Sequence, residues 1–195
     1  NITNECNMKL MSRYEDNHFD IAIVDPPYGI GISKNPVRQQ HEKKQWDNAI
    51  PTDEYFKELF RVSKNQIIWG GNYFDLPPTQ GFFIWNKKQP HDFSLAMVEM
   101  AWSSLQKPAK MWDLSVLKER GKIHPTQKPV ELYEWLLMNN AETGFKILDT
   151  HLGSGSIAIA CDKQGFDLVA CELDEDYYKS ALKRLKQHQQ QLTMF

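Results

Sequence analysis

The stretch Lys146-Ile147-Leu148-Asp149-Thr150-His151-Leu152-Gly153-Ser154-Gly155-Ser156 decides the fold of this chain. Its first four residues are typical of a buried strand, and the run from Ser156 to Gln164 is typical of a helix. Two glycines therefore join a strand to a helix, and glycines there let a ligand approach the backbone at the start of the helix. We expect a ligand-binding turn at this place.

The position of the turn in the chain is as informative as its composition. The spacing of Gly153, Gly155 and Ala158 also fits a dinucleotide-binding fingerprint, and Glu172 ends the next strand, where an acid would bind ribose hydroxyls. A nicotinamide or flavin enzyme is therefore one alternative. Such a fold normally begins with this unit, however, and only residues 156–195 follow Gly155. The rest of the sheet must come from earlier in the chain, which predicts a Rossmann-like domain whose two halves are permuted.

A second stretch, Ile21-Ala22-Ile23-Val24-Asp25-Pro26-Pro27-Tyr28-Gly29, joins a short apolar strand to a rigid turn. The two prolines hold the Asp25 side chain and the Pro26 carbonyl outward, as acceptors without a competing donor. Two such acceptors suit the hydrogens of an exocyclic base amine, and the ring of Tyr28 is suited to stack on the base. For residues 25–28 alone, a strand followed by an ordinary Pro-Pro turn is an equal alternative.

Strands and helices alternate along the chain, which indicates an α/β layered fold with a mostly parallel, twisted sheet flanked by helices. The pattern predicts further strands over 66–69, 82–85, 95–102 and 167–172, and further helices that begin near Thr52, at Pro129 and at Asp174.

Composition indicates a single globular domain over residues 1–195, since 41% of the chain is hydrophobic and 12% is aromatic. No apolar run is long enough to cross a bilayer, and residues 1–6 lack the features of a signal peptide, so we expect a cytoplasmic protein with no membrane partner. Cys6, Cys161 and Cys171 are not spaced as metal ligands, and we expect buried thiols and no metal site.

The net charge of −2 argues against indiscriminate binding to nucleic acid, yet the segments 31–48 and 103–130 are both basic. Solvated surface is the usual role of such segments. If both border one cleft, they favour a nucleic-acid partner. The candidate contacts are Lys34, Arg38, Lys43, Lys44, Trp46, Lys110, Lys118 and Arg120, with Trp112 as a further aromatic candidate.

A third segment, His124-Pro125-Thr126-Gln127-Lys128-Pro129, is a stiff lead-in to a helix with donors for an anion. Taken in order, residues 25–28, 124–129 and 149–156 resemble the permuted β-class of S-adenosylmethionine-dependent DNA amino-methyltransferases, which make N6-methyladenine or N4-methylcytosine. The likeness runs from about Asn4 to Tyr178. An aspartate at the head of the tetrapeptide resembles the adenine enzymes more than the cytosine ones.

The resemblance implies a catalytic role for Asp25, Pro26, Pro27 and Tyr28, which would hold the amine of a flipped base. It implies S-adenosylmethionine as the cofactor, with Asp149 at the methionine ammonium, Thr126 and Lys128 at its carboxylate, Glu172 on the ribose and Leu173 on adenine. The full set of expected cofactor residues is Glu5, Asp25, His124, Thr126, Lys128, Asp149, His151, Gly153, Gly155, Glu172 and Leu173. No metal or covalent nucleophile is needed, because positioning and polarisation of the amine supply most of the catalysis.

The motif order also predicts a division of the chain into a catalytic half at 1–102, a short recognition segment at 103–123 and a cofactor half at 124–195. Thr150-His151 stands where the family usually has Pro-Phe. The affinity for the cofactor is the property that this departure would change. The expected partner is DNA, within a bacterial or phage restriction-modification setting, and relatives are often homodimers. Methylation of cytosine N4 or of RNA, or a catalytically silent binding subunit, are the alternatives.

Overall fold

A computed structural model of the chain describes residues 1–31, 50–90, 92, 96–115, 123, 124 and 126–192. The strands are β1 (Ile2–Asn4), β2 (Ile21–Val24), β3 (Gln66–Trp69), β4 (Gly81–Asn86), β5 (Val98–Ser103), β6 (Lys110–Asp113), β7 (Lys146–Asp149) and β8 (Asp167–Glu172). The α-helices are α1 (Asn7–Met11), α2 (Asp53–Val62), α3 (Val130–Asn140), α4 (Ser156–Gln164) and α5 (Glu175–Leu192), and η3 (Gly71–Tyr73) is a 3₁₀ turn.

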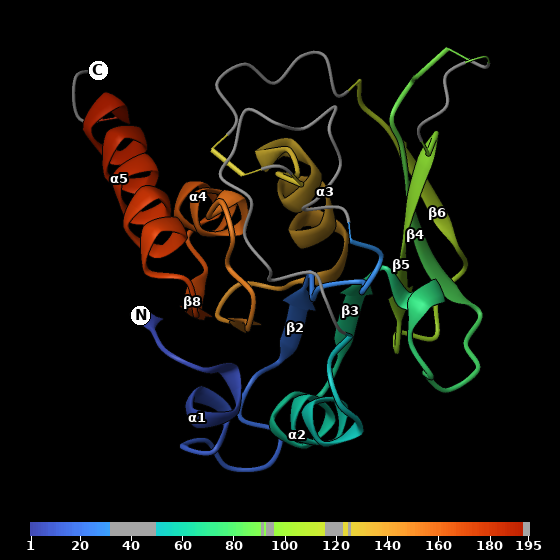
Figure 1. Ribbon diagram of the computed structural model, residues 1–195, viewed down its shortest axis with the longest axis horizontal. Helices are drawn as coiled ribbons and strands as arrows, with labels where there is room; N and C mark the ends of the chain where they lie inside the picture. The colour runs from blue at the N-terminus through green and yellow to red at the C-terminus, as the bar shows by residue number, and fades with distance from the viewer. Residues whose placement is uncertain (32–49, 91, 93–95, 116–122, 125, 193–195) are drawn as a thin grey trace.

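The strands form one sheet in the order β1-β8-β7-β2-β3-β5-β4-β6 (Figure 1). Among the described strands only β5 runs against the others, because its pairings with β3 and β4 are antiparallel and the remaining pairings are parallel. The predicted mostly parallel α/β sheet is confirmed.

The chain reverses its direction of travel across the sheet between β2 and β7. These strands are parallel neighbours, with Ile21 opposite Ile147 and Ala22 opposite Leu148. From β2 the chain continues through α2 to β3 on one side, and from β7 it continues through α4 to β8 on the other. Ligands of open α/β sheets bind at such a point, outside the carboxyl ends of the strands. The two motifs at Asp25 and Asp149–Ser156 follow those two ends, although residues 21–24 and 146–149 lie far apart in the sequence.

Helices cover both faces of the sheet, with α3, α4 and α5 on one face and α1 and α2 on the other (Figure 1). Alternation along β2 sends Ile21 and Ile23 into the core under α3 and α4, and Ala22 and Val24 into the core under α1 and α2. All four side chains are buried, which explains why this strand reads as a continuous apolar run. The strand that leads to Asp25 is thus held from both faces.

Most predicted elements have the expected bounds, and β2, β3, β7, α4 and β8 match residue for residue. The expected strand over 95–102 begins at Val98, and β1, α1 and β6 were not predicted. Strand β6 changes the interpretation of Trp112. This residue lies opposite Trp85 of the neighbouring strand β4, and its ring stacks on Trp135 of α3 at 6.0 Å between centroids. The ring of Trp112 packs against the core and remains partly exposed, so its contact with DNA stays a prediction.

Within the described parts of the chain, no helix combines the length and apolar character that crossing a bilayer requires. Cys161 and Cys171 are buried free thiols, as expected, whereas Cys6 is exposed. Burial raises the pKa of the Cys161 thiol to about 12, so it packs as a small apolar group and is not a nucleophile.

Candidate functional site

Two cavities lie side by side at the carboxyl ends of the strands. The first cavity has a volume of about 470 Å³ and lies over the ends of β7 and β8. The second has a volume of about 410 Å³ and lies over the ends of β2 and β3 and the start of β5. Four residues line both cavities: Asp25, Pro27, Thr126 and Lys128. A ligand in either cavity therefore meets the carboxylate that follows β2.

The turn after β7 is shaped by a carboxylate from the next strand. Glu172 accepts hydrogen bonds from the Gly153 amide at 2.8 Å and the Asp174 amide at 2.9 Å. Burial raises the pKa of Glu172, and these amides oppose the rise. A pyrophosphate would need free amides in this turn, and the Gly153 amide is already occupied. The geometry is thus unfavourable for the dinucleotide alternative.

The second glycine of the turn serves helix packing. Gly155 has φ +73°, and a Cβ at this position would lie 3.0 Å from the Cβ of Ala181 on α5. Gly155 does not line the first cavity, whereas Gly153 does. Of the two glycines expected beside the cofactor, one therefore meets the cavity and the other lets α5 pack closely against the turn.

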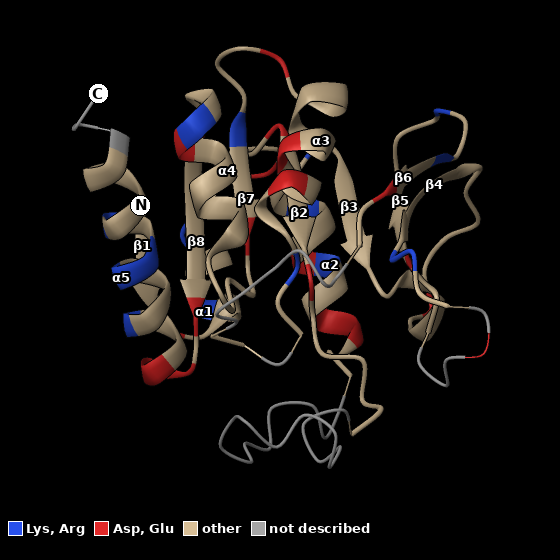
Figure 2. Ribbon diagram, turned by 90° about the horizontal axis from the view of Figure 1, so that it is seen from above, with Lys and Arg blue, Asp and Glu red and all other residues tan. Residues whose placement is uncertain are grey.

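The wall of the first cavity carries more acidic than basic groups. Its described lining includes the carboxylates Glu5, Asp25, Glu172 and Asp174, and Lys128 as its single Lys or Arg side chain. Figure 2 shows the acidic residues at the carboxyl end of β8 and at the start of α5, on one edge of the sheet. This surplus suits a ligand that carries positive charge, as the sulfonium and ammonium of S-adenosylmethionine do, and it opposes a pyrophosphate.

Asp149 lies behind the lining of this cavity. It is 2% exposed and is absent from the cavity wall, whereas Thr150 and His151, which follow it, are part of the wall. Its carboxyl accepts a hydrogen bond from the His151 amide at 3.0 Å. Burial raises the pKa of Asp149 to about 8, so the group is mostly protonated at neutral pH.

His151 presents a neutral ring to the first cavity. The amide nitrogen of Asn7 lies 3.1 Å from Nε2 and can only donate, so Nε2 accepts and the ring proton is on Nδ1, 3.0 Å from the Thr150 hydroxyl. That hydroxyl also bonds the hydroxyl of Tyr55 at 2.7 Å. Burial lowers the pKa of His151 to about 4. A fixed, uncharged ring therefore stands where the family usually has Pro-Phe.

Three other expected cofactor residues line the first cavity in different ways. Glu5 is held by both terminal nitrogens of Arg13, whose hydrogen bonds lower the pKa of Glu5 to about 2. The His124 ring contacts Tyr177 at 4.4 Å between centroids, and its Nδ1 accepts from the Thr126 amide. Leu173 is 74% exposed at the rim, where it leaves an apolar surface for a ligand.

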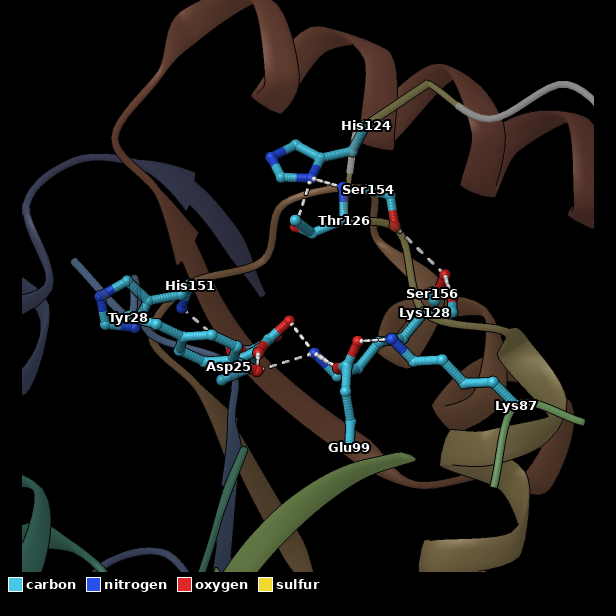
Figure 3. A network of polar contacts seen from close by, with 11 residues as sticks. Asp25, Tyr28, Lys87, Glu99, His124, Thr126, Lys128, His151, Ser154 and Ser156 are labelled. Atoms are coloured by element: carbon cyan, nitrogen blue, oxygen red, sulfur yellow. Dashed lines mark hydrogen bonds and ion pairs between the residues drawn. The ribbon is translucent and has the colours of Figure 1, made fainter. Parts of the chain in front are cut away.

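A row of alternating charges lines the second cavity and ends at the wall shared with the first, and we name Lys87, Glu99, Lys128 and Asp25 the charge chain (Figure 3). The Lys87 ammonium lies 2.5 Å from Glu99 Oε1, and the Lys128 ammonium lies 3.1 Å from Glu99 Oε2 and 2.5 Å from Asp25 Oδ2. The Tyr28 hydroxyl donates to Asp25 Oδ1 at 2.7 Å. Two ammonium groups and two carboxylates make the chain neutral overall.

The members of the charge chain shift one another's pKa values. Burial alone would raise the pKa of Glu99, but the ammonium groups of Lys128 and Lys87 outweigh it and lower the pKa to about 2. Burial opposes the charge of Lys128, yet Asp25 and Glu99 raise its pKa. Burial raises the pKa of Asp25, and Lys128 acts in the opposite direction. Each charge depends on its neighbours because the site is largely removed from water.

Two expectations about this region need correction. Asp25 was expected to offer acceptors without a competing donor, but Tyr28 and Lys128 donate to its two oxygens. Lys128 was expected to face the carboxylate end of the cofactor, but its ammonium is bonded to Asp25 and Glu99. The reason is burial: an ammonium that is 2% exposed must be paired, and these two carboxylates are within reach.

The tetrapeptide is otherwise arranged to present an aromatic surface. Tyr28 stacks on Tyr73 at 5.0 Å with an interplanar angle of 13°, and a Cβ on Gly70 would overlap the Tyr28 ring. Asn72 and Tyr73 line the second cavity. Pro26 and Pro27 also belong to its wall.

Sequence reasoning missed Lys87 and Glu99. A signal for Glu99 was present, because it is the one charged residue in the run Val98-Glu99-Met100-Ala101-Trp102. Its side chain points from β5 to Lys128, which lies 29 positions later in the printed sequence. No local pattern joins the two.

Most of the expected nucleic-acid contacts lie outside the described residues. These are Lys34, Arg38, Lys43, Lys44, Trp46, Lys118 and Arg120. Lys110 is described. It begins β6, is exposed, and donates to the side-chain oxygen of Asn139 on α3 at 3.2 Å.

Comparisons with known proteins give one consistent answer. The family model described as DNA methylase, of N6/N4 methyltransferases, matches residues 68–183, more than half of the chain. The type II methyltransferase M.HpaI of Haemophilus parainfluenzae is 22% identical over 91% of this chain and 71% of its own length.

Solved structures show the same fold. The M1.HpyAVI complex with S-adenosylmethionine superposes with a TM-score of 0.61 at 18% identity, over 94% of this chain and 98% of that one. The cytosine-N4-specific PvuII DNA methyltransferase superposes with a TM-score of 0.65 at 11% identity, over 96% and 90% of the two chains. The Rossmann-like methyltransferase fold predicted from the motif order is confirmed.

Proposed function

The chain belongs to the DNA methylase family, and on that premise we propose that it transfers a methyl group from S-adenosylmethionine to the N6 amine of adenine in DNA. The observation that carries the proposal is the wall between the two cavities. Asp25 lies in both, so a methyl donor in the first cavity and a base in the second would meet at its carboxylate. Transfer requires such a shared boundary, because donor and acceptor must be in line and in contact.

The first cavity fits the cofactor by its chemistry. S-adenosylmethionine, when bound, supplies an electrophilic methyl group on a positively charged sulfur. Glu172 would accept from the ribose hydroxyls, since each of its oxygens has a lone pair beyond the amide it already binds. His151 and Leu173 would cover flat apolar parts of the ligand. Asp149 would act on the ammonium only indirectly, because the backbone of Thr150 and His151 lies between the two groups.

The second cavity would hold the base after it leaves the stack. The stacked rings of Tyr28 and Tyr73 offer a flat surface for it. The Asp25 carboxylate and the Pro26 carbonyl would accept the two amine hydrogens, which favours a pyramidal nitrogen whose lone pair points at the methyl group. Burial raises the pKa of Asp25, and the Lys128 ammonium opposes that rise and so favours the ionised carboxylate. These residues hold and polarise the amine, and no covalent intermediate on the protein is involved.

Adenine is the base we propose, because aspartate heads the tetrapeptide 25–28 and this resembles the adenine enzymes. The structural likeness to the cytosine-N4-specific PvuII enzyme makes cytosine N4 the second candidate. Both amines are exocyclic and conjugated to a ring, so the acceptors at Asp25 and Pro26 suit either one.

The test is mass spectrometry of nucleosides from unmethylated duplex DNA after incubation with the protein and S-adenosylmethionine. We expect N6-methyladenine from the wild type and a loss of about 10³-fold or more with Asp25→Ala, because that variant lacks the group that polarises the amine. Cofactor affinity, measured by calorimetry, should stay near that of the wild type. Asp20→Ala is the matched control: Asp20 immediately precedes β2, bonds Lys64, and lines neither cavity.

Each other outcome changes the proposal in a defined way. N4-methylcytosine would replace the base and keep the mechanism. Methylated RNA under the same conditions would replace the substrate. If folded protein binds the cofactor and yields no methylated nucleoside, the function is that of a silent binding subunit, and normal turnover by Asp25→Ala would remove this residue from the mechanism.

A further inference from the structure

The Lys128 ammonium lies between two carboxylates, and this position sets a constraint on the site. Its acceptors are Asp25 Oδ2 at 2.5 Å, Glu99 Oε2 at 3.1 Å and the Tyr28 hydroxyl oxygen at 3.2 Å. An ammonium has three hydrogens, so these acceptors account for all of them. The side chain is 2% exposed, and a buried cation of this kind is costly to leave unpaired.

The two present donors weaken Asp25 as an acceptor for the amine, because each already uses a lone pair of one carboxylate oxygen. Tyr28 donates to Oδ1 and Lys128 to Oδ2. When an amine hydrogen approaches the carboxylate, the bond from Lys128 is the one with an alternative acceptor in place, because Glu99 is already 3.1 Å from the same nitrogen. The Tyr28 hydroxyl keeps its proton, since burial raises its pKa well above the ordinary value.

Resting on the proposed function, we propose that Glu99 is a positioning residue, which takes over the Lys128 ammonium when the target amine binds Asp25. A small movement of the ammonium from Asp25 toward Glu99 makes Oδ2 a stronger acceptor for the amine and leaves no buried charge unpaired. Glu99 acts through Lys128 and does not itself touch the reacting atoms.

Lys87 makes Glu99 suitable for this role. Lys87 immediately follows β4, and its ammonium bonds the other carboxylate oxygen of Glu99 at 2.5 Å. Glu99 belongs to β5. Together with Lys128, Lys87 lowers the pKa of Glu99 to about 2 despite burial. Glu99 lines the second cavity and is absent from the described lining of the first, so a change here should leave the cofactor cavity intact.

The kinetic test compares Glu99→Gln with Glu134→Gln. Glu134 pairs with Lys163 and lies outside both cavities, so its variant makes the same chemical change in an ion pair remote from the site. We expect Glu99→Gln to lower kcat about tenfold, with cofactor affinity within about twofold of the wild type, because Lys128 then stays on Asp25. Glu134→Gln should keep both values. Equal kcat values for the two variants would overturn the proposal.

A second readout is independent of turnover. The groups that face Asp25 are Lys128, Tyr28, Glu99 and, from β7, Asp149, with Lys87 one step away. In cofactor-free protein, carbon-13 NMR of the carboxyl groups should show a lower pKa of Asp25 in Glu99→Gln, which removes a negative charge, and a higher one in Lys87→Met, which removes a positive charge. Shifts of the same sign in both variants, or none, would indicate a structural role only and overturn the proposal.

These two readouts also distinguish the positioning role of Glu99 from the proposed methyl transfer. A wild type that makes no methylated nucleoside overturns the proposed function, and the opposite pKa shifts would still support the coupling of Glu99 to Asp25. If Glu99→Gln does not fold, Glu99→Asp takes its place. It keeps the charge and withdraws the carboxylate from Lys128, and a kcat equal to that of the wild type would then overturn the proposal.

Discussion

The two cavities share a wall and are similar in volume, but they are built differently. In the first, the carboxylate of Glu172 is held by main-chain amides of Gly153 and Asp174. In the second, Asp25 is held by side chains, namely the Lys128 ammonium and the Tyr28 hydroxyl. Main-chain donors are fixed by the fold, whereas an ammonium on a long side chain can exchange partners.

This difference matches what each cavity would have to do. A cofactor cavity gains affinity from preorganised groups that do not move on binding. The boundary with the substrate must instead accept a new donor at Asp25 and then release it, and the charge chain provides a second acceptor for Lys128. The first cavity also carries surplus acidic charge, whereas the charge chain of the second is neutral.

Removing Lys128 should produce the largest effect. Lys128→Met removes the cation that Asp25 and Glu99 share and leaves Asp25 without an ammonium, so we expect the free energy of unfolding to fall by about 3–5 kcal/mol in urea denaturation at pH 7. Lys64→Met is the control, because Lys64 pairs with Asp20 in an exposed ion pair that water screens. Equal losses in the two variants would mean that the charge chain is no more important for folding than a surface pair.

Changing Glu172 probes the main-chain construction of the first cavity. Glu172→Ala leaves the amides of Gly153 and Asp174 without their acceptor, and we expect cofactor affinity to fall about 10- to 100-fold, the effect of about 1–3 kcal/mol. Glu172→Gln keeps an acceptor oxygen and should lose less. Calorimetric titration measures both. If Glu172→Ala binds as tightly as the wild type, the turn keeps its shape without this carboxylate.

The pH dependence of stability should reveal the neutral acid beneath the first cavity. Burial raises the pKa of Asp149 to about 8, above its value in the unfolded chain, so between about pH 4 and 8 the folded state holds a proton that unfolding releases. Stability from this group therefore falls as pH rises through that window, by at most about 1.4 kcal/mol per pH unit. Asp149→Asn should flatten the slope of the melting temperature.

Asp20→Asn provides a control of opposite sign. Burial opposes ionisation of Asp20, but Lys64 and the Lys146 amide lower its pKa below the unfolded value. Its contribution is therefore present above the unfolded pKa and is lost as pH falls through the folded one. If Asp149→Asn leaves the slope between pH 5 and 8 unchanged, Asp149 is ionised in the folded protein.

The sequence allowed the frame of the site to be predicted, because strand ends and turns are local features. The apolar run Ile21–Val24, the prolines after Asp25 and the glycines after Asp149 each act on a few neighbouring residues, and parallel pairing then brings the two strand ends together. The partners of Asp25 are a different matter. Glu99 and Lys128 come from separate elements, and their pairing depends on which buried charges the tertiary fold places within reach.

The contact of Trp112 also could not be predicted from the local sequence. Substitution of this residue should have the smallest effect. Its neighbours Lys110 and Asp113 are polar because β6 is the edge strand, yet the ring lies against Trp135 on the covered face. We expect Trp112→Phe to lower the free energy of unfolding by about 1 kcal/mol, through a smaller apolar contact, and to leave DNA affinity unchanged in fluorescence anisotropy. Phe83→Leu controls for loosened packing, because the Phe83 ring also contacts Trp135, edge-on at 5.7 Å between centroids. A selective loss of DNA affinity in Trp112→Phe would show that the β6 edge, and not only the two cavities, takes part in binding nucleic acid.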